Sequence, residues 1–241
     1  MKKTLIIVLI CLLAVAGCYL VYQAFSYLRY LNDPRSQSFM QWATGNATDR
    51  ANLITVQRET CPGAPFILPA DGFVGLLYED PRGPYSNRNP HQGIDIFSDT
   101  DPGLTPVYAA YEGYITREAD WRSSLILRIP EDPLNTSEQI WLYHTHMADR
   151  EGNDFIEDAF PPGTKELFVK QGTLLGYTGD YNGTSARDVW VHLHFSIVKD
   201  DGNGRYLNEL QVSNTLDPTP YLGLPLNYKA ASAEMNCLAD E

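Results

Sequence analysis

The sequence predicts a mainly β protein: one antiparallel β-sheet or β-sandwich domain preceded by a transmembrane or signal helix. Two observations favour the β domain. From residue 61 onward, short apolar runs alternate with Gly, Pro, Asn and Asp, as in short strands joined by turns. No long amphipathic helix and no internal repeat follows residue 60. The third observation is an uncharged apolar run near the N-terminus, which predicts the helix.

This apolar run covers residues 4–22, roughly the length that a helix needs to cross a bilayer. One interpretation of residues 1–30 is an uncleaved anchor, with the two N-terminal lysines held in the cytoplasm. The other is a lipoprotein signal, because residues 15–18 (VAGC) resemble a lipobox ending at Cys18. The anchor is favoured because the apolar run continues beyond Cys18. Both interpretations tether the chain to the cell membrane, with its domain outside the cytoplasm.

The composition is that of a globular protein with one sizeable domain and an appendage: 241 residues, 44% hydrophobic and 20% charged. The formal net charge is −12, and residues 1–30 contain three basic and no acidic residues, so the remainder carries −15. Such an acidic domain argues against nucleic acid as a partner. A membrane tether would instead raise the local concentration of the domain near a surface substrate.

Four cysteines are present, two of them inside the apolar run. The other two, Cys61 and Cys237, bracket the rest of the chain. Outside the cytoplasm they would either form a disulfide that joins the start of the domain to its tail or remain two unpaired thiols. The sequence leaves both alternatives open, because it does not give their separation in space.

The residue composition divides the chain after residue 30 into three segments. Residues 31–60 read as a stem and linker, residues 61–225 as the β domain, and residues 226–241 as a C-terminal tail. The strands expected in the domain are Gly93–Phe97, Val107–Ala110, Gly113–Arg117, Ser124–Ile129, Gln139–His146, Leu174–Tyr177 and Val189–Val198.

The five histidines are confined to three short motifs rather than scattered. They are His91 in NPHQGIDIF, His144 and His146 in LYHTHMAD, and His192 and His194 in VHLHF. A single histidine on a strand is most often a structural residue. Confinement to three motifs instead indicates one site assembled by folding.

Neutral imidazole and carboxylate are good zinc ligands, and a catalytic zinc usually has three protein ligands and one open position. In HQGID, a loop that runs into a strand brings His91 toward Asp95. His192 and His194 project from one face of a strand, because alternate side chains share a face. One of the pair can therefore bind a metal while the other lies beside it.

These motifs resemble those of the lysostaphin-type (LytM-like) zinc metallopeptidases, which cut peptide bonds in bacterial peptidoglycan. The resemblance covers most of residues 61–223. It rests on HQGIDIF, on VHLHF, and on three further segments: GLTPVYAAYEGYI, VKQGTLLGYTGDYNG and LDPTPYL.

The resemblance implies that His91, Asp95 and His194 bind Zn²⁺ and that His146 and His192 are catalytic. Zinc makes hydroxide available near neutral pH, and a neutral histidine can take a proton from water and return it to the leaving amine. The expected function is a zinc endopeptidase acting on peptidoglycan peptides, either cross-links or stem peptides.

The chain departs from the family pattern in two places. The family often has tyrosine two residues before the catalytic histidine, whereas this chain has His144 there and Tyr143 beside it. His144 and His146 are expected to share a strand face, so either could lie nearest the zinc. His146 is chosen as catalytic because Met147 matches the hydrophobic residue that usually follows in the family, and His144 is then a neighbour of the site. The segments PEDPLNTSEQ and ADREGNDFIEDAFPPGTKE are long, and we expect them to reshape the walls of the substrate groove.

Two other functions remain as alternatives. Some family members have lost their ligands and bind the wall or activate other hydrolases, but here all five expected positions are filled. A cupin-type metal site would use the two HxH pairs, but it leaves HQGID without a role. Tyr85, Tyr181 and Trp190 could line a peptide groove, yet aromatic residues are more often core, so they are not assigned to the site.

Overall fold

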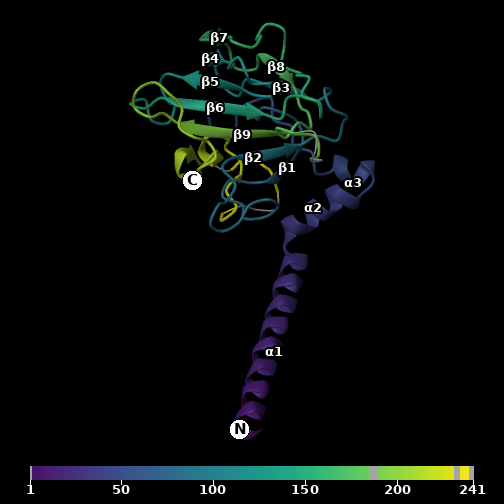
Figure 1. The fold of residues 1–241 in the computed structure, drawn as a ribbon. Coiled ribbons are helices and arrows are strands. Elements are labelled where there is room, and N and C mark those ends of the chain that lie inside the picture. The colour runs from purple at the N-terminus through teal and green to yellow at the C-terminus, as the bar shows by residue number, and fades with distance from the viewer. Residues whose placement is uncertain (1, 185–188, 231–233, 239–241) are drawn as a thin grey trace. The chain divides into compact units, whose positions relative to one another are not determined.

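The computed structural model describes residues 2–184, 189–230 and 234–238 (Figure 1). The chain forms two compact units, Met1–Gly45 and Asn46–Glu241. Of the segments expected from the sequence, the C-terminal tail at 226–241 lies partly outside the described residues, at 231–233 and 239–241.

The first unit is helical. Helix α1 covers Lys2–Asn32 and helix α2 covers Pro34–Thr44. Asp33 separates them as the N-cap of α2: its carboxylate accepts a hydrogen bond from the Ser36 amide, and Pro34 occupies the first turn, where its missing N–H costs nothing. Within the described residues, none of the helices combines the length and apolar character needed to cross a membrane.

The second unit is built on an antiparallel sheet, in agreement with the predicted mainly β fold. Its strand order is β1-β2-β9-β6-β5-β4-β7, with β10 paired to β9. The strands are β1 (Phe73–Leu76), β2 (Ile94–Phe97), β4 (Gly113–Thr116), β5 (Leu125–Ile129), β6 (Ile140–Thr145), β7 (Leu167–Val169), β9 (His192–Lys199) and β10 (Thr215–Leu216).

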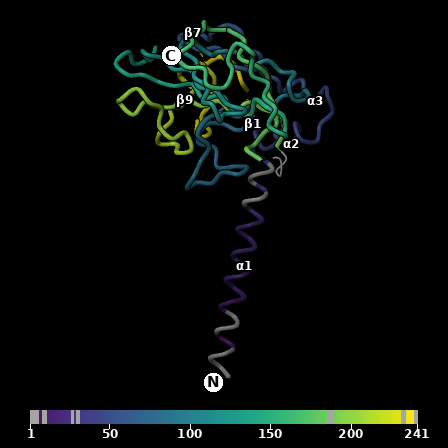
Figure 2. The backbone as a smooth tube through the Cα atoms, turned by 45° about the horizontal axis from the view of Figure 1, so that its top comes forward, coloured from purple at the N-terminus to yellow at the C-terminus, as the bar shows by residue number. Residues whose placement is uncertain are grey.

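A second, two-stranded sheet pairs β3 (Pro106–Tyr108) with β8 (Leu174–Tyr177). Helices are short in this unit: α3 (Ala47–Ala51), α4 (Thr219–Leu222) and a 3₁₀ turn at Val212–Asn214. Figure 2 shows the long loops that connect the strands around the sheets.

The two faces of the large sheet have different surroundings. On β9, the alternate residues Leu193, Phe195 and Ile197 belong to the main hydrophobic core. The intervening residues His192 and His194 therefore project from the opposite face. The second face thus carries the histidine pair, while the first anchors the strand in the core.

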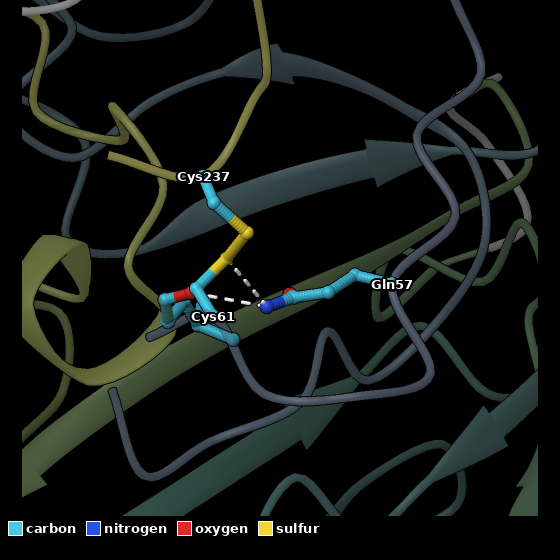
Figure 3. Close-up of a disulfide and its surroundings, with 4 residues drawn as sticks. Gln57, Cys61 and Cys237 are labelled. Atoms are coloured by element: carbon cyan, nitrogen blue, oxygen red, sulfur yellow. Dashed lines mark hydrogen bonds between the residues drawn. A yellow bond between two sulfur atoms is a disulfide. The ribbon is translucent and has the colours of Figure 1, made fainter. Parts of the chain in front are cut away.

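A disulfide between Cys61 and Cys237 decides between the two alternatives left by the sequence. Their Cα atoms are 5.5 Å apart, and the bond closes a sequence separation of 176 residues. The Gln57 amide donates to Cys61 Sγ at 3.1 Å and to the Leu222 carbonyl at 3.1 Å (Figure 3). Gly223 follows at φ +66°, where an added Cβ would lie 2.5 Å from Cys61 Cβ, so this position admits only glycine without a shift.

Reduction of this disulfide is expected to lower the free energy of unfolding by about 3–5 kcal/mol, because a long closed loop strongly restricts the unfolded chain. Denaturant unfolding with and without reductant measures the effect. The control is the double variant Cys11→Ser/Cys18→Ser, which lacks the two free thiols and keeps the disulfide. An unchanged unfolding midpoint after reduction would contradict this prediction.

Candidate active site

His91 is fixed by its backbone and by one ring nitrogen. Its amide donates to the Asp80 carbonyl at 3.0 Å and its carbonyl accepts from the Glu79 amide at 2.9 Å. Its Nδ1 donates to the Leu77 carbonyl at 3.0 Å, and the side chain is fully buried. This hydrogen bond leaves Nε2 as the unprotonated ring atom, which lies 3.2 Å from Asp95 Oδ1.

Asp95 and His194 are brought together by strand register. They lie directly opposite each other in the β2–β9 ladder, so their side chains share a face. Asp95 Oδ1 lies 2.8 Å from His194 Nδ1, and His91 Nε2 lies 3.0 Å from the same nitrogen. All three residues are buried, with exposed fractions of 5% or less.

Two imidazole nitrogens and one carboxylate oxygen therefore converge: the ligand atoms of His91, Asp95 and His194 all lie within 4.8 Å of one another. This donor set, buried and drawn from one loop and two adjacent strands, fits a catalytic zinc. The three residues that the sequence predicts as ligands are thus brought together.

The charges in this cluster are interdependent. Burial raises the pKa of Asp95, but the neighbouring imidazoles of His91 and His194 outweigh it and hold that pKa well below its usual range. Burial lowers the pKa of His194, but the charge of Glu209 and hydrogen bonds to Asp95 and Glu209 raise it to about 10. A divalent cation at this position would replace the proton of His194.

His146 and His192 lie next to the cluster and close to each other, with ring centroids 4.3 Å apart. His146 Nδ1 donates to the Tyr181 carbonyl at 2.6 Å, and His192 Nδ1 donates to the Trp190 carbonyl at 2.6 Å. In both rings Nε2 is then the atom able to accept a proton. The ring centroids of His146 and His194 are 6.4 Å apart.

Both rings are held neutral. Desolvation by the surrounding protein, reinforced by the neighbouring imidazole of His192, lowers the pKa of His146 to about 3. Burial likewise lowers the pKa of His192, although the charge of Asp95 partly opposes it. At pH 7 both imidazoles are available as bases.

His144 does not belong to the site, so the expectation that it shares a face with His146 and neighbours the site is wrong. It lies opposite Phe195 in the β6–β9 ladder, on the core face, and the two ring centroids are 5.2 Å apart. The alternation fails because β6 ends at Thr145 and His146 takes a left-handed conformation with φ +69°. That backbone turn directs His146 to the other side.

His144 is fully buried, and its Nε2 has no hydrogen-bond partner in the described part of the chain. Burial lowers the pKa of His144 to about 4. As pH falls below 6.5, the unfolded chain therefore binds a proton that the folded chain refuses. The free energy of unfolding should fall between pH 6.5 and 4, by up to about 3 kcal/mol from this residue.

Replacing His144 with leucine or phenylalanine should therefore make the free energy of unfolding less dependent on pH between 6.5 and 4. Denaturant unfolding at several pH values measures that dependence. Two variants are needed because their packing differs while both lack the imidazole. A pH dependence equal to that of the unmodified chain in both variants would contradict the prediction.

A cavity of about 520 Å³ opens onto the site. Its lining includes His146, His194, Tyr85 and Tyr181. The Tyr85 ring centroid lies 4.5 Å from that of His91. Two aromatic residues that the sequence analysis left unassigned therefore line the pocket. Trp190 is not among the lining residues, and it serves the site through its carbonyl.

Glu209 also lines this pocket, and sequence analysis gave no signal for it. Its Oε1 lies 2.7 Å from His194 Nε2. Glu209 follows His194 by 15 residues and lies outside every motif, so only folding brings the two together.

No family model matches this chain, and no curated protein matches it. Solved structures that are similar to it include a protein from Ruminococcus gnavus assigned as a glycyl-glycine endopeptidase lytM, with 24% identity and a TM-score of 0.38. Csd3 from Helicobacter pylori shows 18% identity and a TM-score of 0.39. Lysostaphin shows 19% identity and a TM-score of 0.39.

The matches cover 64%, 66% and 69% of this chain, respectively. They span 53%, 33% and 54% of the solved chains, so this chain corresponds to about half of their length or less. Identities below 25% and TM-scores below 0.5 leave the functional assignment to the chain's own motifs and geometry.

Proposed function

We propose that this protein is a zinc-dependent endopeptidase that hydrolyses peptide bonds in bacterial peptidoglycan, in cross-links or stem peptides. The observation that carries the proposal is the convergence of His91, Asp95 and His194 beside the paired rings of His146 and His192. The resemblance of the sequence motifs to lysostaphin-type peptidases supports the choice of substrate.

His91 Nε2, Asp95 and His194 Nδ1 would hold the zinc. When bound, zinc supplies a Lewis acid that activates water near neutral pH. The low exposure of the three ligands keeps competing bulk water away from them.

His146 and His192 would move the proton. Nε2 of a neutral imidazole accepts it from the attacking water, and the resulting imidazolium stabilises negative charge on the carbonyl oxygen. The same nitrogen then donates the proton to the leaving amine, so the peptide C–N bond breaks and one water is consumed. The carbonyls of Tyr181 and Trp190 fix the rings of His146 and His192 for this exchange.

We also propose that residues 1–30 tether the protein to the cell membrane with the peptidase domain outside the cytoplasm. The uncharged run at residues 4–22 supports this, as do its exposed side chains, among them Leu12, Leu20 and Val21. The intact mass of the membrane-extracted protein would distinguish an uncleaved anchor from lipid on Cys18.

The proposal is tested with purified full-length protein and isolated peptidoglycan. Mass spectrometry of the released fragments should identify new amino and carboxyl ends of peptides and so name the bond that is cut. Chelation should stop their release and added zinc should restore it. Cleavage by demonstrably metal-free protein would refute the mechanism, whereas binding without cleavage by zinc-loaded protein would indicate a wall-binding or activator module.

A further inference from the structure

Glu209 lies in the segment that connects β9 to β10, close to the predicted zinc ligands. Its carboxylate is 15% exposed and the imidazole of His194 is 6% exposed. Burying a carboxylate is costly unless it is paired. Here the pairing is the 2.7 Å contact between Glu209 Oε1 and His194 Nε2. A partly buried carboxylate in a loop, in contact with a predicted ligand, points to a role in the site.

We propose that Glu209 is a positioning residue that holds the His194 ring with Nδ1 toward the metal. This inference rests on the proposed zinc site. Glu209 and Asp95 bind opposite ends of the same ring, because Nε2 of His194 contacts Glu209 while Nδ1 contacts Asp95. Glu209 thus lies on the far side of the ring from the ligand atom. It acts through His194 rather than as a fourth ligand.

The loop around Glu209 is itself fixed. The Asn208 side chain accepts from the Leu210 amide at 3.1 Å, and the Asn208 carbonyl accepts from the Asn214 side chain at 2.9 Å. The Gln92 side chain donates to the Leu210 carbonyl at 3.2 Å. Gln92 follows His91 in the sequence. The loop that carries Glu209 therefore contacts both His194 and the residue next to His91.

The two predicted histidine ligands have different outer partners. His91 donates to a neutral backbone carbonyl, that of Leu77, whereas His194 faces the carboxylate of Glu209. A carboxylate partner fixes the ring and makes the other nitrogen a stronger donor to a metal, and its loss typically lowers metal affinity by about 10–100-fold. Glu209 therefore strengthens the ligand that comes from VHLHF.

The test compares full-length wild type, Glu209→Ala, Glu209→Gln and Glu131→Ala, the last replacing an exposed glutamate that does not line the pocket. Zinc dissociation constants are measured by competition with a chromophoric chelator. Cobalt-substituted protein gives an absorption spectrum that reports ligand geometry. Circular dichroism confirms that each variant is folded.

We expect Glu209→Ala to weaken zinc binding about 10–100-fold and alter the cobalt spectrum, with one metal still bound per chain. Glu209→Gln should lose less affinity, because its amide oxygen can still accept the hydrogen bond from Nε2. Glu131→Ala should match wild type in both measurements.

Unchanged zinc affinity and cobalt spectrum in folded Glu209→Ala would overturn the inference, as would loss of stoichiometric zinc in Glu209→Gln, which would make Glu209 a ligand. If Glu209→Ala is unfolded, Glu209→Gln decides: weaker zinc binding with one metal still bound per chain supports positioning, and wild-type affinity and spectrum overturn it. A wild-type chain that binds no zinc refutes both proposals. A zinc-loaded wild type that cuts no peptide refutes the endopeptidase alone and leaves the role of Glu209 standing.

Discussion

Replacing His146 with alanine is expected to lower peptide hydrolysis by about 10²–10⁴-fold while leaving zinc bound. The reason is geometric. His146 lies outside the ligand set, and its Nδ1 is occupied by the Tyr181 carbonyl. Its Nε2 is therefore the atom available to exchange a proton with the reacting groups.

The measurement pairs initial rates on defined peptidoglycan peptides with zinc content per chain. His144→Leu is the matched control, because that histidine lies on the core face, and we expect its rate to stay near that of the unmodified chain. Full activity in His146→Ala would transfer the proton exchange to another group. Loss of zinc in His146→Ala would instead make it a ligand.

Replacing Asp95 with alanine is expected to abolish both zinc binding and hydrolysis. Asp95 contributes the carboxylate of the ligand set, and its Oδ1 contacts both His91 and His194. Without it, two imidazoles remain, and they lose the negative charge that offsets a divalent cation. The loss of affinity should exceed the roughly 10–100-fold that removal of an outer partner causes.

Zinc per chain after gel filtration and the dissociation constant measure this effect. Asp95→Asn is measured beside it, because this variant keeps a ligand oxygen and removes the charge. Its zinc affinity should lie between that of the unmodified chain and that of Asp95→Ala. Asp95→Ala with full zinc occupancy would refute the proposed ligand set.

The sequence located most strands of the two sheets. The strand expected at Val189–Val198 corresponds to β9 at His192–Lys199, and Leu174–Tyr177 is β8 with the same limits. Alternation and turn residues carry enough information there because each strand has one face in the core. Strands β1, β7 and β10, of four, three and two residues, were missed.

The limits of the sequence are clearest around the second histidine motif. Period-two alternation put His144 and His146 on one face, and a single left-handed residue at the end of β6 reversed the outcome. A positive φ in a histidine depends on the hydrogen bonds and packing around it, such as the bond to the Tyr181 carbonyl. The residue types in a short stretch of sequence do not specify those contacts.

By itself, the sequence determined the β fold class, the three histidine motifs and the donor types of the proposed zinc site, because these follow from local periodicity and side-chain chemistry. The tertiary structure decided which residues that are far apart in the sequence come into contact. Strand register set Asp95 against His194, the pairing of Cys61 with Cys237 closed the domain, and the loop after β9 carried Glu209 to the far nitrogen of His194. Each of these contacts joins residues at least 15 positions apart, and their approach is fixed by the packing of the whole sheet.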